Sequence, residues 1–155
     1  MIPQRINLIL YSTLAVIICY IDRVNISVAI IPMQEQFGWS DSQVGFIFSS
    51  FYLGYMLTMA LGGYLSDKFG GKLVLGWGVV LWSIFTMLTP LAAHNGFFAL
   101  FFIRVLMGIG EGVTFPAWHS LYARWIPFNE RTRAIAFTNS GAVSYTHLTL
   151  PTTDR

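Results

Sequence analysis

Residues 104–112 read RVLMGIGEG, and this stretch places an arginine and a glutamate inside a segment that is otherwise apolar. A charged side chain at the centre of a bilayer costs at least about 2.5–3.5 kcal/mol, so such residues face the interior of a helix bundle or a water-filled cavity. Arg104 and Glu111 are seven residues apart, two helical turns, and therefore share nearly one helix face. The three glycines beside them let another backbone or a ligand approach closely.

The composition is that of a membrane protein. Of the 155 residues, 55% are hydrophobic and only 10% are charged, whereas soluble domains carry about 25% charged residues. The net charge of +2, without a basic stripe, excludes a nucleic-acid partner. The single cysteine, Cys19, excludes a disulfide framework, and the histidines are too scattered for a metal site. We therefore predict neither a metal nor an organic cofactor.

Hydropathy and length predict an all-α, polytopic membrane protein. A spanning helix needs about 20 largely apolar residues. Four segments meet this requirement, at about residues 8–31, 44–65, 73–92 and 97–122. Pro32 is expected to end the first span, and Pro116 to kink the fourth.

A fifth span begins at Ala134 but stays incomplete, because the apolar-leaning stretch AIAFTNSGAV gives way to SYTHLTLPTTDR. Roughly ten such residues cannot cross about 30 Å of hydrocarbon. We therefore predict that residues 1–143 form an incomplete transmembrane unit and that residues 144–155 are a non-native tail on a truncated copy.

Basic residues outside the spans predict the orientation. All six fall on one side of the four predicted spans, and the two connections on the other side contain neither lysine nor arginine. The six are Arg5, Lys68, Lys72, Arg124, Arg131 and Arg133. The positive-inside rule makes their side cytoplasmic, so the N-terminus is expected inside. The predicted location is the plasma membrane, or the inner membrane of a bacterium.

Polar groups from three spans reach the middle of the membrane. At about 1.5 Å per residue, Asp22 and Tyr55 lie about 15 Å from the outer ends of their helices, Arg104 about 10 Å and Glu111 about 21 Å. With Arg23, the set holds two acids and two bases and is neutral overall. This balance is what buried charges need, because an unpaired charge would cost far more.

Four local patterns together resemble the major facilitator superfamily, and more narrowly its anion:cation symporter branch. The patterns are YIDRVNISVAI at 20–30, GGYLSDKFGGK at 62–72, RVLMGIGEG at 104–112 and WIPFNERTRA at 125–134, and the resemblance covers about residues 6–143. It implies a twelve-helix transporter of two six-helix halves, each with inverted three-helix repeats. This chain would supply helices one to four and part of the fifth. Its partners would be the bilayer, a small anionic substrate and the missing C-terminal half, without which we expect no transport.

The resemblance assigns a gating role to two cytoplasmic clusters. The loop motif between helices two and three would form a latch, and the cluster after helix four would be its ion-pair partner. These residues are Gly63, Asp67, Gly70, Lys72, Glu130, Arg131 and Arg133. The alternative is that their charges only set topology.

The resemblance also divides the membrane-embedded residues by role. Asp22 and Glu111 match acids that carry the proton in proton-coupled members. The substrate-binding residues would be Arg23, Asn25, Tyr52, Tyr55 and Arg104. Neutralising a carboxylate would release an arginine to bind an anion through two parallel hydrogen bonds, which couples proton to anion. Sodium is the alternative coupling ion, and a purely structural pairing of helices one and four is the alternative role for the charges.

Two functions of different classes therefore remain. The first is secondary transport of an organic or inorganic anion by alternating access. The second is a self-contained four-helix membrane protein with a structural role, suggested by the GxxxG spacing of Gly108 and Gly112. An enzyme is disfavoured because the sequence offers no nucleophile–base set. His119, near the Arg104–Glu111 face, is a candidate proton relay, although such a residue more often hydrogen-bonds within the bundle.

Overall fold

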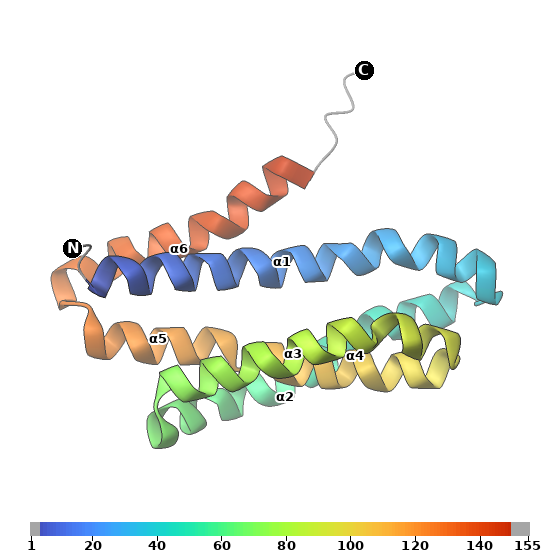
Figure 1. Ribbon diagram of the computed structural model, residues 1–155, viewed down its shortest axis with the longest axis horizontal. Coiled ribbons are helices and arrows are strands. Elements are labelled where there is room, and N and C mark those ends of the chain that lie inside the picture. Colours follow the sequence, from blue (N-terminus) through green and yellow to red (C-terminus); the bar gives the residue numbers. More distant parts are fainter. Residues whose placement is uncertain (1–3, 150–155) are drawn as a thin grey trace. The chain divides into compact units, whose positions relative to one another are not determined.

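A computed structural model describes the backbone of residues 4–149 and the side chains of residues 5–141. Every regular element in this range is a helix, which confirms the all-α class (Figure 1). The helices are α1 (Gln4–Phe37), α2 (Asp41–Phe69), α3 (Gly71–His94), α4 (Phe97–Gly112), α5 (Thr114–Trp125) and α6 (Phe128–Thr149). Four segments of the described chain are long and apolar enough to span a bilayer, with α4 and α5 together forming the fourth. The protein is an integral membrane protein.

Helix α1 runs through Pro32, where the sequence predicted an end. A proline inside a helix removes one hydrogen bond to the residue four positions earlier and introduces a kink, but it need not stop the helix. The helix ends at Gly38 instead, whose φ of +65° is a conformation that glycine adopts without strain. Ser40 then caps α2, and its hydroxyl accepts a hydrogen bond from the backbone N–H of Gln43.

The fourth span is interrupted at Val113, between α4 and α5. Pro116 lies four residues after Gly112 and has no N–H to donate to the Gly112 carbonyl. The helical bonds resume directly afterwards, since the N–H of Ala117 donates to Val113 O at 3.0 Å. The interruption therefore lies one turn before the proline, and Pro116 accounts for it.

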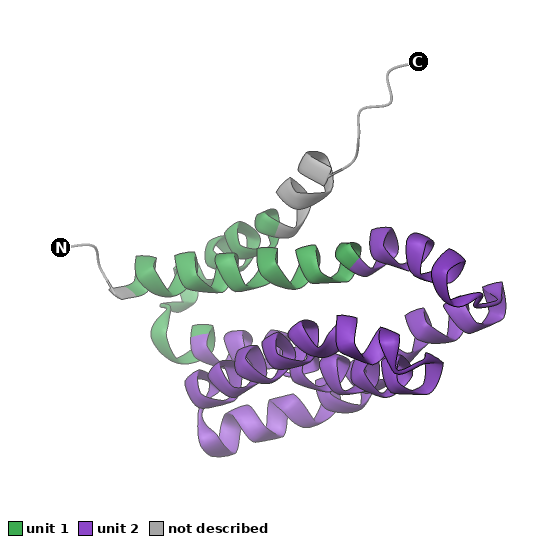
Figure 2. Ribbon diagram, turned by 45° about the vertical axis from the view of Figure 1, so that its right-hand side comes forward, with its two compact units in different colours: residues 1–25, 122–155 green, residues 26–121 purple. Residues whose placement is uncertain are grey.

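The chain divides into two compact units (Figure 2). The first contains residues 1–25 and 122–155, and the second contains residues 26–121. In the second unit, α4 packs along both α2 and α3. This contact needs glycine: a Cβ on Gly108 would lie 3.0 Å from Tyr55 N, and one on Gly110 would lie 2.9 Å from Trp82 N. Backbones therefore touch on two sides of α4.

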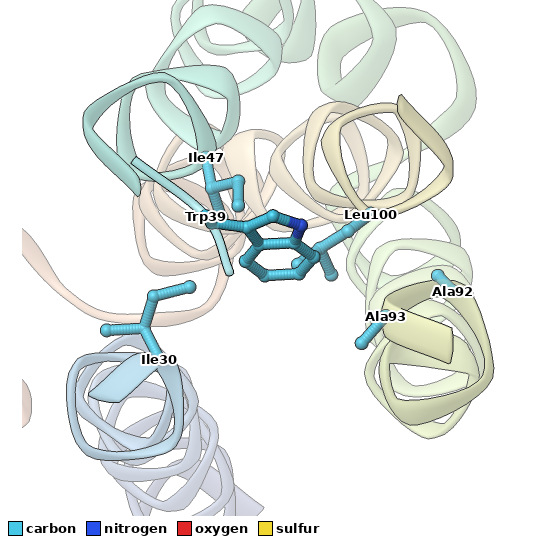
Figure 3. Close-up of a cluster of buried hydrophobic side chains, with 6 residues drawn as sticks. All are labelled: Ile30, Trp39, Ile47, Ala92, Ala93 and Leu100. Atoms are coloured by element: carbon cyan, nitrogen blue, oxygen red, sulfur yellow. The ribbon is translucent and has the colours of Figure 1, made fainter. Parts of the chain in front are cut away.

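One end of the second unit is closed by a hydrophobic cluster around Trp39. Figure 3 shows the indole of Trp39, which lies in the connection between α1 and α2, in the middle of the group, whose other members come from α1, α2, α3 and α4. They are Ile30, Trp39, Ile47, Ala92, Ala93 and Leu100. Burying an indole removes a large apolar area from water, so this cluster holds the four helix ends together.

In the first unit, α6 packs against the start of α1 and the end of α5. A Cβ on Gly141 would lie 3.0 Å from the Thr13 side chain. The Tyr122 hydroxyl lies 2.5 Å from Thr138 Oγ1, and both groups are buried. Interhelical hydrogen bonds of this kind tie helices in an apolar surrounding.

Helix α6 begins at Phe128, six residues before the predicted start of the fifth span. Its first turn is polar, with Glu130 donating its backbone N–H to Pro127 O at 3.0 Å. Hydropathy detects only the apolar part of a helix, so the prediction began too late. The backbone of residues 144–149 continues α6, residues 150–155 of the predicted tail lie outside the described residues, and the non-native origin of the tail stays a prediction.

Candidate functional site

The two charges of the opening stretch are buried on α4. Arg104 is 3% exposed and Glu111 is 0% exposed, although both lie in a segment that is otherwise apolar. Their spacing places them on nearly one face, two turns apart. The predicted burial of this polar face is therefore correct, and the neighbours of each charge can be examined within the second unit.

Two neutral side chains, those of Met107 and Phe51, contact the Arg104 guanidinium. Its Nη1 donates a hydrogen bond to the Met107 sulfur at 3.4 Å. Its Cζ lies 5.0 Å from the centroid of the Phe51 ring on α2, within cation–π range. The Met107 sulfur also lies 3.8 Å from the hydroxyl of Thr86 on α3. Side chains from α2 and α4 thus contact this arginine, and Thr86 of α3 approaches one of them, Met107.

Glu111 lies beside one of the close contacts between α4 and α2. A Cβ on the next residue, Gly112, would lie 2.6 Å from Tyr55 O, so the two backbones are in contact. Thr58 on α2 also approaches Gly112, and its hydroxyl donates to Gly54 O at 2.9 Å. The carboxylate therefore comes from a part of the helix that is tightly enclosed.

Of the two tyrosines predicted for the site, Tyr55 is the better placed. It is half-buried and stacks on Phe51, with ring centroids 6.0 Å apart. Tyr52 is 54% exposed, and its ring packs edge-on against the Phe51 ring, with ring centroids 5.4 Å apart. The Phe51 ring thus contacts both tyrosines and the Arg104 guanidinium.

Asp22, Arg23 and Asn25 belong to the first unit, on α1. Asp22 and Arg23 are half-buried, and Asn25 is exposed. The Arg23 guanidinium lies 5.4 Å from the centroid of the Tyr20 ring, another cation–π contact. A joint site of these residues with Arg104 and Glu111 stays a prediction.

Comparison with known proteins decides the family. The family model described as Major Facilitator Superfamily matches residues 12–144, most of the chain. The chain belongs to the Major Facilitator Superfamily.

Its relatives within this superfamily are named as anion transporters. The chain is 51% identical over 139 residues to "Probable anion transporter 4, chloroplastic" of Oryza sativa subsp. japonica, covering 90% of this chain and 24% of the relative. It is 49% identical to "Ascorbate transporter, chloroplastic" of Arabidopsis thaliana, covering 90% and 26%. It is 47% identical to "Sodium-dependent phosphate transport protein 1, chloroplastic" of Arabidopsis thaliana, covering 90% and 27%. The chain spans about a quarter of the length of these relatives.

The superfamily loop motif forms the tight turn between α2 and α3. Gly70 has a φ of +90° and donates its N–H to Ser66 O at 3.0 Å, which ends α2 and starts α3. Such a φ favours glycine. Asp67 and Lys72 are exposed beside this turn, and a Cβ on Gly63 would meet nothing within 4 Å. The turn thus explains Gly70, whereas the latch role of the motif stays a prediction.

The charged cluster after the fourth span, predicted to be cytoplasmic, has contacts of its own in the first unit. Glu130 pairs with Arg5 at 3.9 Å, an exposed ion pair of small energetic value. Arg131 donates from Nη2 to Ala123 O at 2.9 Å and so binds a carbonyl at the end of α5, where a positive charge is favoured. Arg133 is exposed. Pairing of this cluster with the latch stays a prediction.

Two residues of this neighbourhood were missed in the sequence, namely Met107 beside Arg104 and Thr86 beside Met107. Met107 stands three residues after the arginine, so helical spacing could have indicated it. Nothing in the sequence indicates Thr86, because only packing of α3 on α4 brings it close. His119 is exposed, and its ring lies against that of Trp118 at a tilt of 35°, with ring centroids 3.8 Å apart. Among the described residues, no three histidine, cysteine or acidic side chains gather as a metal site.

Proposed function

We propose that this chain is the N-terminal part of a secondary transporter that moves an organic or inorganic anion together with a proton. One observation carries the proposal: Arg104 and Glu111 are buried at 3% and 0% exposure on one helix of a membrane protein. Buried charges in a spanning helix are costly and mark substrate or ion pathways. The names of the relatives, which include ascorbate, phosphate and anion transporters, support an anionic substrate.

In this proposal Arg104 binds the anion and Glu111 carries the proton. A guanidinium offers a planar fork of donors that fits a carboxylate or phosphate through two hydrogen bonds. A protonated Glu111 would leave the cavity with the positive charge that attracts the anion, and release of the proton would restore neutrality. Asp22, Arg23, Asn25, Tyr52 and Tyr55 are the further proposed members of the site. Alternating access would then expose this site to each side in turn.

The missing wall of the cavity would come from the remaining chain. The proposal treats the chain as a fragment of a longer transporter, in line with the quarter of each relative that it covers. Its partners are then the bilayer, the anion and the C-terminal half, with no organic cofactor. The latch residues of the loop motif would control opening toward the cytoplasm, where we also place the N-terminus.

The coupling role of Glu111 is tested in the complete transporter with Glu111→Gln. Uptake driven by a pH gradient should fall at least tenfold, while exchange of labelled for unlabelled anion should stay within about threefold, because exchange needs no net proton movement. Glu35→Gln is the matched control, since Glu35 is an exposed acid near the end of α1. Uptake by Glu111→Gln that keeps its full pH dependence would refute the assignment.

The substrate and the coupling ion are tested with the same preparation. Uptake is measured with a panel of ascorbate, other sugar acids, dicarboxylates and inorganic phosphate, with and without sodium. If transport is coupled to protons, the uptake rate should increase with the pH gradient and should stay unchanged when sodium is replaced by choline. Cell fractionation assigns the membrane, which we propose is the plasma or bacterial inner membrane; the chloroplastic names of the relatives make a plastid envelope the competing location.

The alternative, a structural or assembly protein, draws on the GxxxG spacing of Gly108 and Gly112. In the second unit both glycines face α2, with Cβ positions that would meet Phe51, Tyr55 and Thr58. The two glycines therefore pack α4 against α2 within this chain and are not needed for contact with another chain, which favours the transporter over the assembly role. Extending the genomic reading frame separates the two: further spans downstream support transport, and a genuine stop codon near Arg155 supports the structural role.

A further inference from the structure

We propose that Phe51 and Met107 are positioning residues that hold the Arg104 guanidinium in the orientation that binds the anion. This inference rests on the proposed function and adds a mechanism that sets the affinity of the site for the anion. It concerns the second unit alone, because all three residues lie between 26 and 121.

The two contacts restrain different motions of the guanidinium. The Phe51 ring, 5.0 Å from Cζ, fixes the position of the charged group against α2. The hydrogen bond from Nη1 to the Met107 sulfur, at 3.4 Å, fixes the rotation of the guanidinium plane. A side chain held in one geometry loses less conformational entropy when the ligand arrives, so pre-organisation improves affinity.

Both contacts are made by neutral groups. A carboxylate in either place would cancel the positive charge that has to attract the anion. An aromatic face attracts a cation, and a thioether sulfur accepts a hydrogen bond, more weakly than a carboxylate does, and neither group carries a net charge. These two side chains therefore orient the arginine and add no negative charge beside it.

Backbone packing fixes the two positioning residues. Gly108 lies one turn after Arg104, and a Cβ there would lie 3.1 Å from the Phe51 carbonyl carbon. The glycine thus sets the α2 backbone directly beside the arginine. On the other side, the Thr86 hydroxyl approaches the Met107 sulfur at 3.8 Å, and Met107 is only 2% exposed. Neither side chain has room to move away.

The test at Phe51 lowers the electron density on the face of the ring and keeps the shape of the side chain. In the complete transporter, Phe51 is replaced by mono-, di- and trifluorophenylalanine through stop-codon suppression, and anion uptake is measured for each. Fluorine withdraws density from the ring face and weakens the attraction of a cation. We expect the KM for the anion to rise stepwise, about threefold to thirtyfold across the series. The maximal rate and the thermal stability should stay within twofold and within about 2 °C of the unsubstituted protein.

The same series at Phe48 is the control, because this half-buried ring of α2 packs against the apolar cluster around Trp39. A KM that is flat across the Phe51 series, or that rises equally at Phe48, overturns the proposal. Absence of uptake by the unsubstituted protein would instead refute the proposed function, so the two failures are distinguishable.

Met107 is tested by Met107→Leu, which keeps the volume and removes the acceptor sulfur. We expect the KM to rise about twofold to fivefold with an unchanged maximal rate, because one weak restraint on the guanidinium is lost. Met87→Leu is the control, since Met87 on α3 is 79% exposed. Identical kinetics of the two variants would remove Met107 from the proposal.

Discussion

Gly108→Ala tests the central packing contact of the second unit. The added methyl group would lie 3.0 Å from Tyr55 N and 3.1 Å from the Phe51 carbonyl carbon, and it would overlap the Phe51 carbonyl oxygen. These atoms belong to the α2 backbone and cannot rotate away as a flexible side chain can. Relief of the clash therefore requires α2 and α4 to separate.

The cost follows from the size of this separation. Restoring ordinary contact distances moves the helices apart by about 1 Å, and such a gap forfeits a quarter to a half of the dispersion energy of the atoms that face it. Overpacking of this kind typically costs about 1–3 kcal/mol. Because the site is backbone against backbone, we expect the upper part of the range, about 2–3 kcal/mol, and a midpoint lowered by about 4–12 °C for a chain of this size.

The assay is thermal unfolding of the chain in mild detergent, followed as the fraction that stays monodisperse on size-exclusion chromatography. Gly76→Ala on α3 is the matched control, because a Cβ there would meet nothing within 4 Å. Its midpoint should stay within about 2 °C or rise slightly, since alanine favours the helix. If Gly108→Ala unfolds within 2 °C of this control, the close backbone contact between α2 and α4 is refuted.

Two further substitutions test the packing at other places. Trp39→Ala should lower the free energy of unfolding by about 3–5 kcal/mol, because it empties the centre of the hydrophobic cluster. The control Trp77→Ala should lower it by less than about 1 kcal/mol, because Trp77 is 65% exposed. Equal thermal midpoints of the two variants would contradict the role of the cluster. Tyr122→Phe should cost about 1–2 kcal/mol, because it leaves the fully buried Thr138 hydroxyl without the tyrosine as a partner. Tyr64→Phe, at a 64% exposed position, is the control, and a smaller loss for Tyr122→Phe than for Tyr64→Phe in the same unfolding assay would refute the hydrogen bond.

Hydropathy predicted the helical class and the four spanning segments of the described residues correctly, because each spanning segment satisfies its backbone groups within itself. Its errors concern helix ends. It stopped the first helix at Pro32 although α1 continues to Phe37, and it began the fifth at Ala134 although α6 begins at Phe128. In both cases polar or proline-containing turns extend a helix beyond its apolar part, which a hydropathy window does not measure.

The candidate site was predicted in part. An arginine and a glutamate two turns apart in an apolar segment had to be buried, and Arg104 and Glu111 are. The sequence did not show which of Tyr52 and Tyr55 is the more buried. Helical spacing shows which residues share a helix face, but not which of them another helix covers. The structure leaves Tyr52 more than half exposed and stacks Tyr55 on Phe51.

The sequence by itself determined that this is a helical membrane protein of the major facilitator superfamily with a buried arginine and a buried acid. Those properties depend on local composition, on spacing along one helix and on motifs. Only the tertiary structure decided that Phe51 and Met107 contact Arg104, because residues 51 and 104 meet solely through the packing of α2 on α4 at Gly108. A glycine shows that close approach is allowed, and the fold decides which backbone approaches.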